Sequence, residues 1–526
     1  MKKFIFIWAI ISLMMIPVFC LSQETSPFGV AAHLQSGEEH LQMPQNLHMI
    51  REAGIGWMRT DFSWSGIESP QGTWHFDHLD RMVDELEKAD IRILGLLLFS
   101  VDWANPAYRH LDAWLEYVER TVTRYKGRVR HWEIWNEPNL TRFWDTPGGD
   151  PVLYTRLLEV TYKKIKEIDP QVTVLYAGTA GIPYEYLEQS FEAGAGHYFD
   201  LLCIHPYRPF ITSAEQTVQY YDDIERLRAL MAKYRIDKKK IWITEMGVTT
   251  MAGIKTSDKD AFREAREESG KDWKVAVVSD EEFPVDNAFP EEVIRSFFPD
   301  GYTLEFIPVF DLKRLRPDRY DAVFFPPTGI FPLHINLLVS SYLTDYLLAG
   351  GRVYYYTKEG TMYIYDDART KVDNQAVFLG QTLLLSLRFG IERYFWYEFQ
   401  SPERNLFDRE DNFGLVHREL EPKPSYYTYS TLGKLFPEGS TIDRSVEWQR
   451  GDGCFVVSWT QKDNTRVWAA WSPGGVQKVG VKIGKGLRQA LDHLGRELPV
   501  TEASDTLELS PGITYLVGPV SLDFKD

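Results

Sequence analysis

Cysteine is scarce in this chain, with three among 526 residues. Cys20 ends an apolar N-terminal stretch, whereas Cys203 in LLCI and Cys454 in GCFVV lie in apolar segments typical of a buried core. Three thiols placed in this way predict no disulfide framework and no cysteine–histidine metal site. We expect no metal and no cofactor, a prediction that belongs with the function inferred below.

Positive charge is also in deficit. Lysine and arginine total 58 against 75 aspartates and glutamates, which gives a formal net charge of −17. A chain this acidic is repelled by the phosphates of nucleic acids, so nucleic acid is excluded as a partner. Aromatic residues, in contrast, are plentiful at 14%, with 16 tryptophans. They suit either large cores or a cleft whose flat apolar faces bind sugars.

An apolar run covers residues 4–21 at the N-terminus and follows two lysines; Pro17 interrupts it, and small residues follow near Ser22. This pattern predicts a cleaved export signal over residues 1–22. The protein would then be secreted or periplasmic, with no stable membrane insertion after cleavage. The run of 18 residues lies at the lower limit for a membrane span, so an uncleaved anchor is the alternative. A lipid-modified Cys20 fits the residues before it poorly.

Short apolar runs alternate with amphipathic stretches along the rest of the chain. This alternation predicts parallel strands joined by crossover helices. The expected strands are 28–32, 57–60, 92–98, 131–135, 172–177, 201–204, 241–244 and 393–397. Eight such units predict an α/β fold, a (β/α)8 TIM barrel built from residues 23–254 and 366–436.

The seventh and eighth expected strands are much farther apart than one helix requires. The intervening chain contains its own strand-like and helical patterns, which predict a small α/β, flavodoxin-like domain inserted at 255–365. This domain could wall the cleft or join two copies into a homo-oligomer. The last segment, 437–526, consists of short alternating runs separated by glycine, proline and asparagine, which predicts a C-terminal antiparallel β-sandwich.

Acidic residues follow two of the expected barrel strands. The fourth strand ends in Asn136–Glu137 and is stopped by Pro138, while the seventh ends in Thr244–Glu245. In this fold the reacting groups lie at the carboxyl ends of the strands, so both carboxylates are expected at one mouth. Such a pair suits glycoside cleavage, in which one carboxyl protonates the leaving oxygen while the other attacks the anomeric carbon.

Two motifs carry a family resemblance, WNEPN at 135–139 and ITEMG at 243–247. They resemble the signatures of retaining glycoside hydrolases of clan A, most closely family 39, with families 5 and 42 nearby. The resemblance covers 27–250, 370–436 and the β tail. It implies a glycoside hydrolase in which Glu137 is the general acid/base and Glu245 the nucleophile of a double displacement.

The same resemblance implies a set of substrate-binding residues. Asn136 would hold the sugar 2-hydroxyl, and Arg59 would keep the Glu245 carboxylate ionised. The remaining members are His205 and Tyr207 beside the nucleophile, Trp396 as the floor under the sugar, and His33 near its hydroxyls. Trp103 follows a strand end and suits either a sugar subsite or plain packing. Ordinary packing or structural ion pairing is the alternative for Arg59, His205, Tyr207 and Trp396 as well. Glu398 and Asp411 could also reach sugar hydroxyls, and Glu133 fits a partner inside the barrel.

The inserted domain resembles the glutamine-amidotransferase-like domain that accompanies some family 42 galactosidases, on the segments AVFFPPTG and LLAGGRVYYY. Active members of that family use a cysteine, and no cysteine lies between Cys203 and Cys454. Thiol catalysis is therefore excluded there, and we expect a structural role.

The sequence thus predicts an exported retaining glycosidase that acts on an oligosaccharide or polysaccharide. Two alternatives stay open, a non-catalytic carbohydrate-binding or scaffolding barrel and a transglycosylase that uses the same residues. Xylose, glucose, galactose, mannose and uronic acids all suit this barrel, because loop shape decides specificity.

Overall fold

The structure is a computed structural model that describes residues 26–35, 37–144, 146, 148–251, 254–256, 261–278, 295, 298, 301–325, 333–356, 361–366, 368–405 and 408–525. The predicted export signal, residues 1–22, lies outside the described residues. Across the described part of the chain, no helix combines the length and apolar character needed to cross a bilayer.

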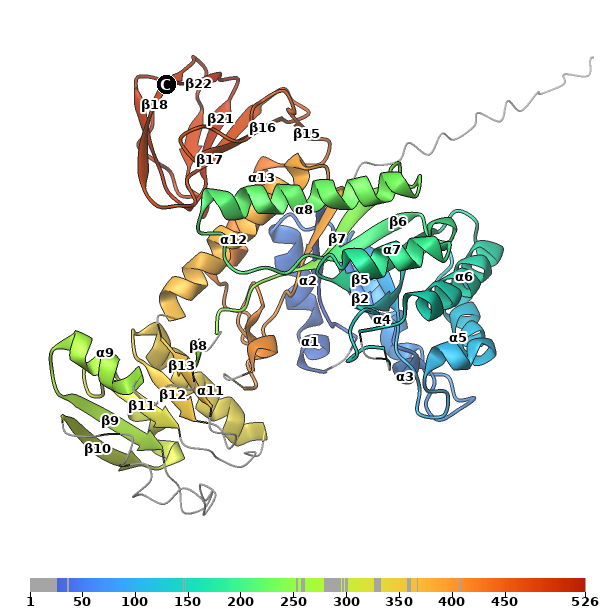
Figure 1. The fold of residues 1–526 in the computed structure, drawn as a ribbon, viewed down its shortest axis with the longest axis horizontal. Helices are drawn as coiled ribbons and strands as arrows, with labels where there is room; N and C mark the ends of the chain where they lie inside the picture. The colour runs from blue at the N-terminus through green and yellow to red at the C-terminus, as the bar shows by residue number, and fades with distance from the viewer. Residues whose placement is uncertain are drawn as a thin grey trace, which may run out of the picture.

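Eight parallel strands close into a barrel in the order β1-β14-β7-β6-β5-β4-β3-β2, which confirms the predicted TIM barrel (Figure 1). Their bounds are β1 Phe28–Ala31, β2 Trp57–Asp61, β3 Arg92–Leu97, β4 His131–Asn136, β5 Thr173–Ala180, β6 Leu201–His205, β7 Lys240–Met246 and β14 Arg393–Trp396. Most residues of these strands are buried, because helices cover the outside and side chains fill the inside. That double burial explains why the strands read as continuous apolar runs.

Helices surround the barrel and follow the expected amphipathic stretches. The main ones are α2 Met43–Glu52, α4 Asp77–Lys88, α5 Leu111–Arg124, α6 Pro151–Ile168, α7 Tyr184–Glu192, α8 Ala214–Lys233, α12 Ala368–Arg388 and α13 Pro424–Leu435. Helix α6 begins at the N-cap Asp150, whose carboxylate accepts from the backbone N–H groups of Val152 and Leu153. Pro151 supplies the first helical residue, where its missing N–H costs nothing.

Aromatic and cationic side chains plug the amino-terminal end of the barrel. Trp57 and Trp242 pack edge to face with ring centroids 5.4 Å apart, and the His131 ring stacks on Trp242 at 5.4 Å. The Arg393 guanidinium lies 4.8 Å from the Trp57 ring centroid. Burial, with Arg393 and Arg92 nearby, lowers the pKa of His131 to about 3. Cys203 is buried in the same cluster, as expected.

The chain between β7 and α12 forms a separate six-stranded sheet in the order β10-β9-β11-β12-β13-β8, at the lower left of Figure 1. Its elements are β8 Ile254–Thr256, α9 Ala261–Ser269, β9 Trp273–Val278, β10 Tyr302–Ile307, η3 Val309–Arg314, β11 Ala322–Phe325, α11 Leu333–Leu348, β12 Val353–Tyr356 and β13 Met362–Tyr365. The first four strands in that order are parallel and follow the arrangement of flavodoxin-like sheets. Strands β13 and β8 are antiparallel additions at one edge. The amidotransferase resemblance and the domain limits stay predictions.

The C-terminal residues form two antiparallel sheets, as expected for a β domain (upper left in Figure 1). One contains β15 Thr441–Ile442, β16 Phe455–Thr460, β17 Arg466–Trp471, β21 Thr514–Gly518 and β19 Gln489–Leu491; the other contains β20 Thr506–Leu509, β18 Gln477–Ile483 and β22 Leu522–Phe524. Both contribute to one core, with Val456 and Leu516 from the first and Val479 and Leu507 from the second. Trp459 donates its indole N–H to the Leu435 carbonyl of α13 at 2.6 Å, which anchors the domain to the barrel.

Candidate active site

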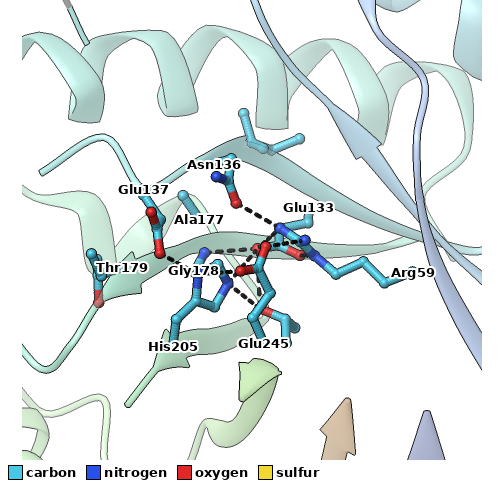
Figure 2. Close-up of polar contacts among 12 residues, drawn as sticks. Arg59, Glu133, Asn136, Glu137, Ala177, Gly178, Thr179, His205 and Glu245 are labelled. Atoms are coloured by element: carbon cyan, nitrogen blue, oxygen red, sulfur yellow. Dashed lines mark hydrogen bonds and ion pairs between the residues drawn. The ribbon is translucent and has the colours of Figure 1, made fainter. Parts of the chain in front are cut away.

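The polar residues predicted to be functional meet at the carboxyl ends of the barrel strands (Figure 2). Arg59 comes from β2, Asn136 and Glu137 from the end of β4, His205 from β6 and Glu245 from β7. Parallel strands present these ends at one rim, which explains why residues far apart in the sequence gather here. Asn136, Glu137 and Glu245 are each 8% exposed, so the carboxylates lie deep in the mouth yet still reach its opening.

Glu137, His205 and Glu245 form a compact group. His205 Nδ1 lies 2.9 Å from Glu137 Oε1 and 3.6 Å from Glu245 Oε2. One carboxylate oxygen of Glu137, one of Glu245 and a ring nitrogen of His205 all lie within 4.8 Å of one another. The His205 ring is fully buried, and its Nε2 lies 3.0 Å from Thr244 Oγ1. His205 is therefore held at both ring nitrogens: Nδ1 faces the two carboxylates, and Nε2 faces Thr244.

Arg59 links the nucleophile candidate to the strand that carries the acid candidate. Its Nη1 donates to Glu245 Oε1 at 2.6 Å, and its Nη2 donates to Asn136 Oδ1 at 2.9 Å. Its Nε donates to Glu133 Oε2 at 2.7 Å. Glu133 is fully buried and also accepts from the backbone N–H of Gly178 at 2.7 Å, so it is a structural partner inside the barrel, as expected. The carboxylates Glu133 and Glu245 outweigh the effect of burial and raise the pKa of the Arg59 guanidinium.

The environment of Glu245 favours its anionic form. Burial alone would raise the pKa of this carboxyl. His205, Arg59 and the hydroxyl of Tyr207, which donates to Glu245 Oε2 at 2.9 Å, outweigh burial and hold the pKa below its usual value. Each oxygen of the carboxylate thus has its own donor, Arg59 on one side and Tyr207 on the other. Burial, with Glu245 nearby, raises the pKa of Tyr207 well above its usual range, so its hydroxyl keeps the proton that it donates.

The backbone around the acid candidate adopts an uncommon conformation. Trp135 and Glu137 have φ angles of 76° and 43°, in the left-handed region that few non-glycine residues occupy. The Glu137 N–H donates to the carbonyl of Gly178 at 2.9 Å. A Cβ on Gly178 would lie 1.9 Å from His205 Nε2, so only glycine leaves room for the histidine ring. Sequence reasoning missed Gly178, although a glycine inside a strand pattern often marks such a close approach.

His33 lies at the rim with several acidic side chains. Its Nδ1 is 3.6 Å from Asp61 Oδ2, and its Nε2 is 4.0 Å from Glu398 Oε2. Burial raises the pKa of the Glu398 carboxyl well above its usual range, and the neighbouring Glu39 and Asp411 add to the rise. The structure therefore places His33, Glu398 and Asp411 together on the β1, β2 and β14 side of the mouth, and Asp61, which lies beside His33, also helps to raise the pKa of the Arg59 guanidinium.

The structure does not support Trp396 as the floor of a sugar site. Its side chain is fully buried, and its indole N–H donates to the Phe413 carbonyl at 3.1 Å, so it offers no free face to a ligand. The next residue, Tyr397, is partly exposed. Burial, together with Glu398 and Glu245 nearby, raises the pKa of Tyr397 well above its usual range. Tyr397 is thus the aromatic residue of this segment that faces the carboxylates, one position from the prediction.

Trp103 packs into the tryptophan cluster beside the mouth. Its ring meets Trp64 edge to face at 5.6 Å, and its indole nitrogen is buried. This contact agrees with the packing alternative for Trp103, but the residue is partly exposed, and a sugar subsite there stays a prediction.

Glu137, His205 and Glu245 are the one group among the described residues whose ligand-type atoms are spaced to suit a metal ion. The positive Arg59 guanidinium, 2.6 Å from Glu245, opposes a second cation there, and Tyr207 occupies the other Glu245 oxygen. We therefore assign no metal to these residues.

Comparisons with known proteins find similarity to glycoside hydrolases. The family model of glycoside hydrolase family 42, described as "Beta-galactosidase", matches residues 36–96. A beta-xylosidase of Geobacillus stearothermophilus is 26% identical over 174 residues, which are 29% of this chain and 34% of that enzyme. The match therefore spans about a third of the length of this curated relative.

Solved structures show the same architecture over most of the chain. A family 39 glycoside hydrolase from Bacteroides cellulosilyticus WH2 superposes with a TM-score of 0.61 at 20% identity, covering 94% of this chain and 81% of that one. A glucosidase from Croceicoccus marinus superposes with a TM-score of 0.51 at 12% identity, covering 90% and 91%. At these identities the structures establish the fold. The resemblance read from WNEPN and ITEMG is confirmed, since the chain is similar to clan A glycoside hydrolases, family 39 among them.

Proposed function

We propose that the protein is an exported retaining glycoside hydrolase that cleaves O-glycosidic bonds in an oligosaccharide or polysaccharide, with Glu137 as acid/base and Glu245 as nucleophile. The observation that supports this most is the closeness of the two carboxyls, with oxygens from β4 and β7 within 4.8 Å. Retaining glycosidases hold these groups about 5–5.5 Å apart, whereas inverting enzymes need about 6.5–9.5 Å to admit a water.

In the first step, Glu245 attacks the anomeric carbon while Glu137 gives its proton to the leaving oxygen. The C1–O bond breaks, an ester forms between C1 and Glu245, and the freed sugar leaves as an alcohol. The donors on Glu245, Arg59 at 2.6 Å and Tyr207 at 2.9 Å, keep it anionic and fix its direction of attack. Asn136 turns its oxygen toward Arg59 at 2.9 Å, so its NH2 group is directed elsewhere, available for the sugar 2-hydroxyl.

In the second step, Glu137 acts as a base. It takes a proton from water, the resulting hydroxide attacks C1, and the ester to Glu245 breaks with net retention at the anomeric carbon. His205, 2.9 Å from Glu137 Oε1, holds the carboxyl in place through both steps. The other Glu137 oxygen then serves the leaving group and the water in turn.

We propose a β-linked sugar, with β-xylosides as the first substrates to test. The curated relative is named a beta-xylosidase, although it matches 34% of its own length. The Croceicoccus marinus structure with this fold is named a glucosidase, so glucosides form the second arm.

The decisive experiment measures hydrolysis of aryl β-xylosides, β-glucosides and β-galactosides by the protein and its Glu245→Ala variant. We expect turnover of at least one substrate with a retained anomeric configuration in the first product, followed by NMR. Glu245→Ala should lose activity by several orders of magnitude, and Glu447→Gln, at an exposed glutamate of the C-terminal domain, should not.

Three outcomes would overturn parts of the proposal. Activity that survives in Glu245→Ala rules out the nucleophile. Binding of xylo-oligosaccharides without turnover of any glycoside favours the non-catalytic barrel. Transfer to an added acceptor sugar that exceeds hydrolysis favours the transglycosylase.

A further inference from the structure

Two partly exposed phenylalanines flank the mouth on the side of Glu137. Phe99 follows β3 and Phe143 follows β4, and their rings are nearly parallel, with centroids 6.3 Å apart and planes 21° apart. Neither ring belongs to the buried core clusters of the described residues. Leu140, on the same loop as Phe143, is 37% exposed. These side chains form a partly exposed apolar surface, here called the Phe99–Phe143 platform.

The platform is built directly onto the segment that carries the acid/base candidate. The Leu140 N–H donates to the Glu137 carbonyl at 2.9 Å, and the Phe143 N–H donates to the Leu140 carbonyl at 3.0 Å. The Trp135 indole, on β4, donates to the Phe143 carbonyl at 2.9 Å. Phe143 is therefore fixed by hydrogen bonds from both ends of the loop, and its position follows that of Glu137.

Phe99 is held in a conformation that costs energy. Its φ angle is 65°, in the left-handed region that bulky side chains avoid. Its ring meets the Trp135 ring at 6.5 Å, edge to face, which keeps it beside Phe143. Strained residues of this kind cluster where a ligand is positioned.

The chemistry of the proposed reaction tells which part of the substrate reaches this surface. Glu137 gives its proton to the leaving oxygen, so the leaving group lies on the Glu137 side of the mouth, opposite the attacking Glu245. A sugar ring has an apolar face of C–H groups that lies flat on aromatic rings. The Arg142 guanidinium lies over the Phe143 ring, 5.3 Å from its centroid, and brings hydrogen-bond donors for sugar hydroxyls to the platform.

We propose that the Phe99–Phe143 platform is the binding subsite for the leaving-group sugar, so that the enzyme cleaves an oligosaccharide more efficiently than a glycoside whose small aglycone does not reach the platform. This inference rests on the proposed glycosidase function. It adds the residues that recognise the second sugar, and it makes the enzyme depend on them when a sugar is the leaving group.

The test compares two substrates that share the transferred sugar. A glycosyl fluoride, xylosyl fluoride on the present proposal, has no leaving-group ring, whereas the matching disaccharide, xylobiose, has one. In Phe143→Ala, kcat/KM for the disaccharide should fall at least about tenfold, which corresponds to about 1.4 kcal/mol, while kcat/KM for the fluoride should stay within about twofold. Phe143→Tyr keeps the ring and should restore disaccharide cleavage. Phe310→Ala, at a half-exposed phenylalanine of η3 in the inserted domain, should change neither value.

The outcomes separate the two proposals. If the unmodified protein cleaves neither substrate of any sugar in the panel, the glycosidase function itself fails. If it cleaves both and Phe143→Ala loses both equally, Phe143 supports the fold or Glu137 and the subsite is refuted. If Phe143→Ala loses neither, the leaving-group sugar binds elsewhere and the subsite is also refuted.

Discussion

Tyr207→Phe offers a sharp test of how Glu245 is kept ionised. The change removes one hydroxyl, the donor 2.9 Å from Glu245 Oε2, and keeps the ring that meets Phe413 edge to face at 6.1 Å. No cavity larger than one oxygen is left, so the fold should tolerate the substitution. The bond to Arg59 at 2.6 Å remains, and Glu245 therefore loses one of its two charge-stabilising donors.

The expected size of the effect follows from the type of bond. A hydrogen bond to a charged group contributes about 1.5–3 kcal/mol, which is a factor of roughly 10 to 150 in an equilibrium. Tyr207 lowers the pKa of Glu245, so its loss must raise that pKa toward the value that burial favours. The acidic limb of kcat/KM should then move to higher pH, because more of the enzyme carries a protonated nucleophile.

The assay is a pH profile of kcat/KM for an aryl glycoside, with the unmodified protein and Tyr207→Phe measured in parallel. We expect the loss of activity to be about 10-fold or more greater on the acidic limb than at the plateau. A uniform loss at every pH, with the acidic limb unmoved, would refute the reasoning. Tyr207 would then act on the substrate or the transition state and not through the charge of Glu245.

Two further predictions concern positions away from the reacting atoms. In Gly178→Ala, the new Cβ would lie 1.9 Å from His205 Nε2, so activity should fall at least about 100-fold and the free energy of unfolding should decrease by roughly 1–3 kcal/mol. Gly451→Ala, where the new Cβ meets nothing within 4 Å, is the matched control. An active and stable Gly178→Ala would show that the histidine ring can move. Burial holds the pKa of His131 at about 3 against 6.5 for the free side chain, so the folded state prefers the neutral ring. The stability of the protein should therefore decline as pH falls below about 6.5. The denaturant midpoint of His131→Phe should decline less over that range, and equal pH dependence in both proteins would contradict the assignment.

Much of the barrel could be predicted because its strands are buried on both faces. Segments such as residues 92–97 and 201–205 read as apolar runs, and the polar residues that end them stand out at the rim. Glu137 and Glu245 could be paired from sequence for the same reason, since parallel strands bring their ends together. Tyr207 and Arg59 both donate hydrogen bonds to Glu245, next to which the resemblance placed them.

The error at Trp396 has a physical cause that sequence does not show. The pairing of β14 with β7 shifts register between Tyr394 and Trp396, so two residues of β14 span three of β7. The additional residue lies in β7, so β14 keeps the ordinary alternation of a strand. Phe395 points inward to the cluster of Trp57 and Trp242, whereas Trp396 packs outward against Phe378 of α12, with ring centroids 6.3 Å apart. The apolar run RYFWY does not show which of its aromatic residues faces inward, because both faces of the strand are buried.

Two further features could not be predicted from the sequence: the close approach of the His205 ring to Gly178 and the left-handed φ angle of Phe99. Both depend on how neighbouring strands and loops meet, and the local sequence offers at most a glycine in one case. A phenylalanine gives no local signal for a positive φ angle, because the surrounding structure imposes it.

The Arg59 guanidinium makes the effects of substitutions at the residues that bind it depend on one another. With Glu133, Asn136 and Glu245 all bound to one cation, replacing Arg59 leaves two buried carboxylates without that cation, and losing one partner of a buried ion pair typically costs about 3–5 kcal/mol. Substitutions within this quartet would have to accumulate jointly or in a narrow order, whereas rim positions such as Leu140 can vary one at a time. When the enzyme diverges toward new sugars, naturally or by directed evolution, substitutions should therefore occur in the loops, while Arg59 and its three partners are retained.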